Sequence, residues 1–292
     1  MPPAALVAAG GAYRGRAMPA HGQDRLRLML AYLSNPSTRN MILGSLALLL
    51  VFLAMWEWGP SAVGIPPYII PRASSVWKEF WIMLAEDRLI YHTLITTYLV
   101  VTGFLLGMFL GMVVGFLLGM SPTAEFILSP YILALQIAPK VAFAPLFVIW
   151  FGFTDYPKIL VAILIVFFPI MVNVLGAVRA IDPDIVRLAR SFNASRTQIF
   201  WKIEFPASLA PLFAGLRIAA TLAVIGVVVG ELVGGNTGLG YLLTLGDATG
   251  NTAKTFVSII MLTIVGIVLY GAIVVAEARV LHFLPARARN AA

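Results

Sequence analysis

The stretch AIDPDIVRLARSFNASRTQIFWKIEFP, residues 180–206, is a short polar and basic segment in a chain that is otherwise mostly apolar. Asp182 followed by Pro183 is typical of a helix start, because the carboxylate can accept hydrogen bonds from free backbone amides and proline suits the first turn. The residues that follow predict a helix with one apolar face. Apolar side chains recur there at spacings of three and four: Ile185, Leu188, Ala189 and Phe192.

A second helix is predicted directly after the first. Asn193 tolerates the left-handed conformation in which many helices end. Ser195 and Gln198 have the spacing of a capping box, which opens a helix. We expect Pro206 to end this second helix. The stretch therefore predicts two consecutive short helices joined by a sharp turn.

The surrounding composition is that of an integral membrane protein. Of the 292 residues, 60% are hydrophobic and 11% are charged, whereas soluble domains have roughly 45–50% apolar and about 25% charged residues. About 20 apolar residues cross the hydrocarbon core as a helix, and the alternation typical of a membrane barrel is not seen. The sequence predicts an all-α bundle of six spans at approximately Met41–Trp58, Ile95–Met120, Tyr131–Gly152, Ile159–Val178, Leu209–Leu232 and Phe256–Leu281.

Positive charge indicates which loops face the cytoplasm. With the N-terminus inside, thirteen Lys and Arg residues fall in inner segments and five in outer segments. We therefore expect both termini in the cytoplasm. The expected parts are a basic N-terminal arm at 1–40, a transmembrane domain at 41–284 that carries the loop at 180–206, and a tail at 285–292.

Several membrane positions are unusual. Gly103, Gly107, Gly111, Gly115 and Gly119 recur every four residues, which predicts close helix packing against a neighbouring span or a second copy of the chain.

Polar and kinking residues in the spans suggest a solute path. A lysine at this depth is costly, so Lys140 either lies on the path or bonds to backbone carbonyls that prolines leave free. Glu231 precedes a glycine-rich segment and either takes part in gating or accepts bonds from glycine amides. The candidate path or gate residues are Gln136, Pro139, Lys140, Phe143, Pro169, Asn173 and Glu231.

Four pieces of the sequence together resemble one family. They are PKVAFAPLFVIWFG, AVRAIDPD, RLARSFNASRTQIFWKIEFPASLAPLFAGLRIA and VVVGELVGGNTGLGYLL, in this order. They resemble the EAA-loop region of type I ABC importer permeases, most closely the nitrate, sulfonate and taurine branch. The resemblance extends over roughly residues 65–285.

This resemblance implies a permease that works as a dimer with two cytoplasmic ATPase subunits and an external solute-binding protein. It implies that the loop docks on the ATPase as a coupling helix. ATP and Mg would be bound by the partner, and no cofactor is expected in this chain. The docking residues implied are Asp182, Arg187, Leu188, Ala189, Phe192, Asn193, Ser195 and Phe200.

Two residues depart from the family pattern. Arg187 stands where the pattern has Glu, which reverses the charge and places any salt bridge from that Glu in doubt. Asn193 stands where the pattern has Gly, and Asn can still adopt the left-handed turn. We expect the fold of the loop to survive and its partner to present a different complement at Arg187.

Other functions are less favoured by the sequence. No G-x-x-x-x-G-K-[ST] motif occurs, so ATP hydrolysis is expected in another polypeptide. The chain has no Cys, its three His residues are far apart in sequence, and no basic patch suggests nucleic acid. An autonomous secondary carrier or channel is the alternative. The expected place is a bacterial inner membrane, and the expected substrate is an oxyanion or sulfonate, with a vitamin precursor such as a pyrimidine or riboflavin second.

Overall fold

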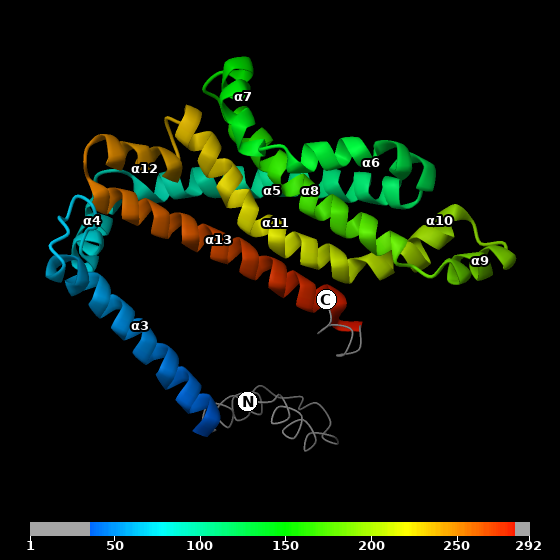
Figure 1. Ribbon diagram of the computed structural model, residues 1–292, viewed down its shortest axis with the longest axis horizontal. Coiled ribbons are helices and arrows are strands. Elements are labelled where there is room, and N and C mark those ends of the chain that lie inside the picture. The colour runs from blue at the N-terminus through cyan, green and yellow to red at the C-terminus, as the bar shows by residue number, and fades with distance from the viewer. Residues whose placement is uncertain (1–35, 284–292) are drawn as a thin grey trace. The chain divides into compact units, whose positions relative to one another are not determined.

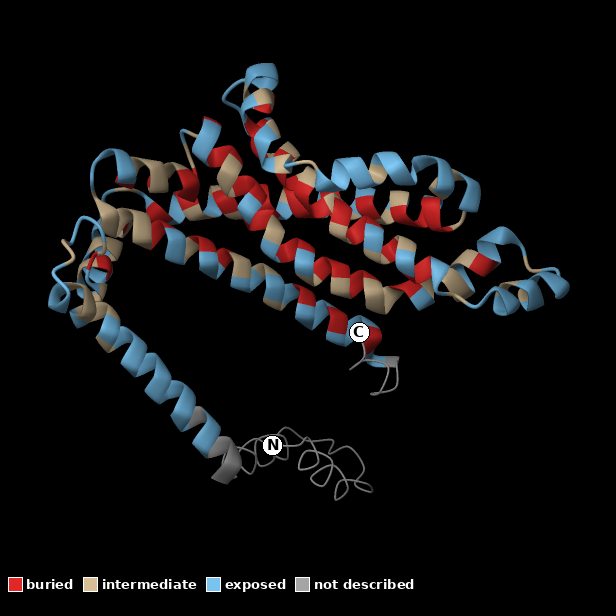
Figure 2. Cartoon of the chain, viewed as in Figure 1, coloured by how far each residue is buried: buried red, intermediate tan, exposed pale blue. Residues whose placement is uncertain are grey.

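The computed structural model describes residues 36–283, so the predictions for most of the N-terminal arm and for the tail lie outside the described residues. The chain divides into two compact units, Met1–Gly64 and Ile65–Ala292. In the first unit the described element is the helix α3 (Pro36–Ala62). Its 20-residue apolar window has no buried residue within the chain (Figure 2). A helix that is apolar all round is typical of a membrane span.

The second unit consists of helices in the part of the chain that the structure describes (Figure 1). Its elements are α4 (Ala73–Ala85), α5 (Leu89–Gly119), α6 (Pro122–Ile137), η2 (Lys140–Phe143), α7 (Ala144–Phe151), α8 (Tyr156–Arg179), α9 (Pro183–Ser191), α10 (Arg196–Ile199), η3 (Phe200–Glu204), α11 (Phe205–Gly234), α12 (Leu239–Ala248), α13 (Thr252–Val280) and η4 (Leu281–Phe283).

The centre of this unit is the packing of α8 between α5 and α11, where most buried residues gather (Figure 2). The predicted row of glycines on α5 lies against α8. A Cβ atom on Gly107 would stand 2.8 Å from Val166, and one on Gly115 would stand 2.8 Å from the carbonyl oxygen of Met171. The row therefore packs on a neighbouring span of the same chain, which is one of the two predicted uses.

The number of spans depends on one bent pair. Five described helices are long and apolar enough to cross a membrane, and α6 with residues 140–151 makes a sixth span if that pair, bent by 80°, is counted as one. The predicted third span, Tyr131–Gly152, corresponds to this bent pair. Pro139 cannot donate a backbone hydrogen bond and restricts the residue before it, so the helix stops at Ile137.

The prediction that Pro206 ends a helix is also wrong. The helix that starts at Arg196 passes through a π-helical turn, Phe200–Glu204, and continues into α11. Pro206 lies in the first turn of α11. The helix is continuous here, so the proline removes one backbone hydrogen bond, and the wider π turn directly before it relieves the clash of the proline ring with the preceding turn.

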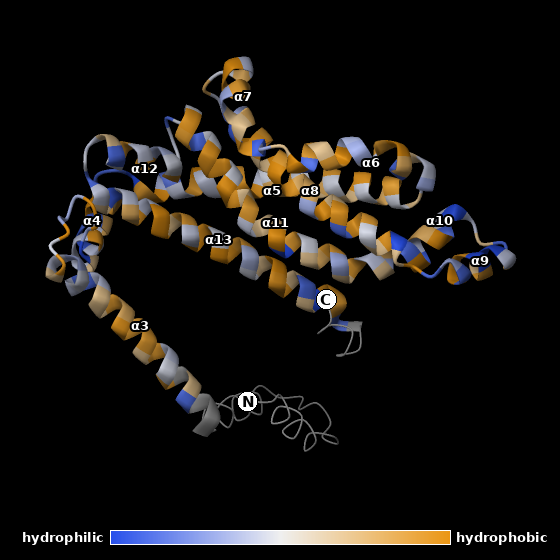
Figure 3. Ribbon diagram, in the orientation of Figure 1, coloured by the Kyte–Doolittle hydropathy of each residue, from blue (hydrophilic) through white to orange (hydrophobic). Residues whose placement is uncertain are grey.

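The two ends of the unit differ in composition. Figure 3 shows hydrophilic residues gathered around α9 and α10, whereas α13 is largely hydrophobic along its length. At the other end, α4 packs against α13. Lys254 of α13 pairs with Asp87 at 2.7 Å, and Asn251 donates to Glu79 of α4 at 2.9 Å. These bonds hold α4 to the bundle.

Candidate functional site

The loop at 182–206, hereafter the knob, has the helix, turn and helix that the sequence predicts. The Asp182 side chain accepts a hydrogen bond from the amide of Asp184 at 2.8 Å and so caps α9. Asn193 has a φ of 57°, in the left-handed region. The reciprocal capping box is present, with Ser195 N donating to Gln198 Oε1 at 2.8 Å and Gln198 N donating to Ser195 Oγ at 3.2 Å. The start of each of the two helices is therefore fixed by local hydrogen bonds.

The knob exposes an apolar face. Leu188 is 60% exposed and Phe192 is 79% exposed, although both belong to the apolar stripe of α9. Ala189 on the same helix is half-buried. Arg187, where the family pattern has Glu, is exposed and pairs with Asp184 at 2.6 Å. Exposed apolar residues on a well-capped helix are typical of an interaction surface.

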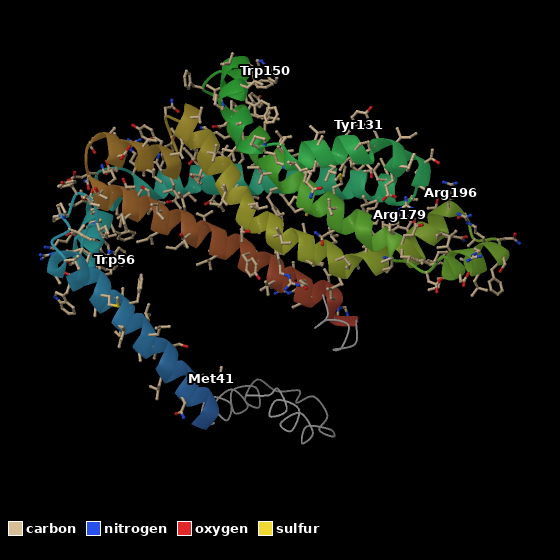
Figure 4. The ribbon with its side chains drawn as sticks, in the orientation of Figure 1. Met41, Trp56, Tyr131, Trp150, Arg179 and Arg196 are labelled. Carbon is tan, nitrogen blue, oxygen red and sulfur yellow. The ribbon has the colours of Figure 1, made fainter. Side chains whose placement is uncertain are left out.

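The base of the knob is held to the bundle by aromatic and ionic contacts. Phe200, which the resemblance places among the docking residues, packs edge to face on Phe116 of α5 with ring centroids 5.2 Å apart. Arg179 at the end of α8 forms an ion pair with Glu125 of α6 (Figure 4). Phe200 thus lies at the root of the knob, and the exposed apolar residues lie on α9.

The candidate path residues gather where α6 breaks from α7. Lys140 Nζ donates to the carbonyl of Gln136 at 2.5 Å and approaches that of Ala138 at 3.5 Å. The ammonium also lies 4.7 Å from the ring centroid of Phe168. Bonding to carbonyls at the proline break was one of the two predicted uses of Lys140. Phe143 lies one turn further on and stacks on Phe147 with centroids 6.1 Å apart.

Pro169 and Asn173 form a local pair inside α8. Asn173 Nδ2 donates to the carbonyl of Pro169 at 2.8 Å, so this donor is used within its own helix. A Cβ atom on Gly215 of α11 would stand 3.1 Å from the Asn173 side chain. Asn173 therefore contributes to the contact between α8 and α11, and Pro169 supplies the carbonyl that binds its amide.

Glu231 is fully buried and holds the glycine-rich segment before α12. Its Oε2 accepts from the amide of Gly240 at 2.7 Å, and its Oε1 accepts from Thr96 Oγ1 at 2.7 Å. Thr96 Oγ1 in turn accepts from the amide of Leu239 at 2.8 Å, and His92 Nδ1 accepts from the amide of Gly238 at 2.9 Å. Acceptance of glycine amides was one of the two predicted roles of Glu231.

We call this set of groups the clamp: His92, Thr96, Glu231 and the backbone of residues 238–240. Gly238 has a φ of +103°, and a Cβ atom there would overlap the Glu231 carboxylate. Only glycine fits both conditions. Sequence reasoning missed His92 and Thr96 as members, because they lie 146 and 143 residues from their partners.

Lys158 is another residue that the sequence did not single out. Its side chain is only 2% exposed and donates to Asp155 at 3.0 Å. A Cβ atom on Gly230 would stand 2.6 Å from the Cα of Lys158, so α8 and α11 are close there. A buried ammonium needs a paired carboxylate, and Asp155 supplies it.

A polytopic helical bundle with a capped, apolar-faced knob at one end defines a class of membrane transport proteins. Residues 103–282 match the family described as the binding-protein-dependent transport system inner membrane component. The chain belongs to this family of ABC transporter permeases, as the resemblance predicted. It is therefore a multi-pass membrane protein with a role in transport.

Similar proteins with descriptions are also transport permeases. The riboflavin transport system permease protein of Chloroflexus aurantiacus is 36% identical over 78% of this chain and 85% of its own length. The formylaminopyrimidine transport permease protein of Halalkalibacterium halodurans is 32% identical over 77% and 89%. The putative aliphatic sulfonates transport permease protein of Bacillus subtilis is 31% identical over 74% and 78%. Of these three relatives, two are named for ring compounds and one for sulfonates.

Proposed function

We propose that this permease is the membrane subunit of an ATP-driven importer in a bacterial inner membrane. In this proposal two permease copies assemble with two cytoplasmic ATPase subunits, which bind the ATP and Mg, and an external protein delivers the solute. Both termini and the knob face the cytoplasm. The positive charge around the knob supports this orientation.

One observation carries the proposal. The knob is fixed by its own caps, yet Leu188 and Phe192 on α9 remain exposed. An apolar face on a rigid body can enter a groove of a partner and transmit its movement, whereas a loose loop would lose the coupling free energy to its own ordering. Arg187 and its neighbour Asp184 flank this face and would meet charges of the partner.

The solute belongs to one of two chemical classes. Oxyanions and sulfonates were the first expectation from the sequence, and vitamin precursors such as a pyrimidine or riboflavin were the second. The described relatives include both classes. The external protein would contribute a large share of the selectivity, and the membrane path would add to it.

The test is ATPase activity in proteoliposomes that hold the permease, its ATPase and the loaded binding protein. Phe192→Glu should lower the stimulation of ATP hydrolysis at least about fivefold, because a charge cannot enter an apolar groove. Phe192→Leu should retain most of the stimulation. Thr197→Glu adds the same charge in the first turn of α10, where a helix favours it, and should change little.

A result with full stimulation in the Phe192→Glu protein would contradict docking through this face. A permease that moves solute in liposomes without any ATPase would instead favour an autonomous carrier.

A further inference from the structure

A cavity of about 460 Å³ lies beside the break between α6 and α7. Its volume is within the range of roughly 300–1,000 Å³ that is common for small-molecule sites. Its lining comes from α5, the end of α6, η2, α7 and α8. The residues that give it chemical character are five aromatic side chains and one ammonium: Phe143, Phe147, Trp150, Phe167, Phe168 and Lys140.

The aromatic side chains come from two sides. Phe147 stacks on Phe143 and lies 5.9 Å, centroid to centroid, from Trp150 on α7. On α8, Phe167 and Phe168 meet edge to face with centroids 4.9 Å apart. Trp150 is 62% exposed and projects from α7 (Figure 4), so one ring of the lining has a face without a neighbour in this chain.

Lys140 supplies the one charged side chain among the described residues that line the cavity. An ammonium has three donors. Two of them point to the carbonyls of Gln136 and Ala138, and no bond given for the described residues uses the third. The cation also lies over Phe168. A single free donor beside aromatic rings suits a neutral ligand with a carbonyl acceptor better than a small sulfonate.

The reason is desolvation. A sulfonate carries a full charge on three oxygens, and its transfer into an apolar cavity is costly unless several donors surround it. A planar ring gains from contact with aromatic faces, and each stacked ring contributes affinity whatever its substituents. The lining offers many ring faces and few donors.

We propose that this cavity binds a planar heteroaromatic solute that carries carbonyl acceptors, by stacking on the α7 and α8 aromatics and by a hydrogen bond from Lys140. The inference rests on the proposed function, since a solute site in the membrane subunit has a use only if the protein transports. It selects ring compounds over sulfonates as the class that this path accepts.

The test uses riboflavin as the probe and the full-length permease in lipid nanodiscs, without the ATPase. Binding is followed by the quenching of flavin fluorescence, because a flavin that stacks on an aromatic side chain loses emission. We expect saturable quenching by the wild type. Trp150→Ala should weaken the affinity at least about fivefold, the loss of one stacking partner.

The adjacent residue offers a matched control. Phe151 lies on the same helix and is 46% exposed, but it does not line the cavity, so Phe151→Ala should bind like the wild type. Lys140→Met should weaken binding about fivefold or more, and Lys140→Arg should bind more tightly than Lys140→Met. Both Lys140 proteins are checked for an unchanged elution volume, so that misfolding is separated from lost binding.

Three results would overturn the inference. The first is no saturable quenching by the wild type in nanodiscs, which would mean that lipid or a second copy fills the cavity. The second is equal affinity in the Trp150→Ala and wild-type proteins. The third is displacement of riboflavin by taurine or ethanesulfonate at a concentration close to the dissociation constant of riboflavin.

A separate uptake assay distinguishes this inference from the proposed function. If riboflavin binding depends on Trp150 but no ATP-driven uptake is measured, the proposed cavity site is supported and the proposed importer function is contradicted. If the protein takes up a sulfonate with ATP but does not bind riboflavin, the proposed importer function is supported and the proposed cavity site is contradicted.

Discussion

The knob and the clamp are built in opposite ways. In the knob, hydrogen bonds join residues two to five positions apart, and the apolar side chains of α9 are exposed. In the clamp, bonds join α5 to the end of α11 and the start of α12, and the polar groups are buried. The knob can keep its shape when it leaves the bundle, whereas the clamp exists only while three helices are together. The first suits a part that meets a partner, and the second suits a part that holds three helices together.

The largest loss of stability is expected from Glu231→Ala. The substitution leaves the Thr96 hydroxyl and the Gly240 amide buried without their acceptor, at about 1–3 kcal/mol for each group. Thermal unfolding of the detergent-solubilised protein should occur at a clearly lower temperature. Glu231→Gln keeps the shape and one acceptor, so its loss should be smaller. An unchanged unfolding temperature for the alanine variant would mean that the clamp contributes nothing.

Gly238→Ala should come next. The added Cβ meets the Glu231 carboxylate, and the backbone at φ +103° is strained for any L-residue, which together cost about 1–3 kcal/mol. Gly250→Ala is the matched control, because Gly250 has a φ of +67° with open space around its Cβ position. The backbone at Gly238 has a ψ of 173°, which is open essentially to glycine alone, so a larger loss than at Gly250 reports this strain together with the contact with Glu231. Equal losses would contradict both.

Ser195→Ala should have a smaller and more local effect. Loss of an N-cap costs about 1 kcal/mol, and here it should increase hydrogen exchange at the amide of Gln198 while the unfolding temperature stays nearly the same. Ser191→Ala removes a hydroxyl that bonds to the carbonyl of Leu188 but caps no helix, and it serves as the control. Faster exchange throughout the bundle would contradict the independence of the knob.

The smallest effect is expected from Asn193→Gly, which restores the family residue at the left-handed position. Glycine adopts a φ of 57° freely, so the free energy of unfolding should change by only about a few tenths of a kcal/mol. Asn193→Val, which disfavours this conformation, should cost about 1–2 kcal/mol in the knob. Hydrogen exchange of the α10 amides compares the two. A large loss in the glycine variant would show that the Asn side chain itself is needed.

The same contrast explains what the sequence could predict. The caps at Asp182 and Ser195 and the turn at Asn193 depend on neighbours in the chain, so their pattern is visible in the sequence. The partners of Glu231 are set by helix packing, and neither His92 nor Thr96 has a local signature that indicates its role. The spans followed from hydropathy alone.

One boundary was predicted wrongly, because prolines act according to context. Pro139 interrupts the third span with an 80° bend, whereas Pro206, which was expected to end a helix, lies in a helix that continues through a π turn. Proline always removes one donor, and the surrounding backbone decides whether the helix stops there. The sequence does not state where the π turn falls.

The glycine row of α5 also restricts motion. Atoms of α8 lie so close to each glycine of α5 that there is no room for a side chain there. If α5 slid along α8 by one residue, a larger side chain would move into the place of each glycine and clash with α8. The next matching register lies four residues away, about 6 Å along the helix. Gradual sliding of α5 along α8 is therefore blocked, and the two helices are expected to move as one rigid body. Movement of helices in this unit is therefore expected at other places, such as the 80° bend after α6.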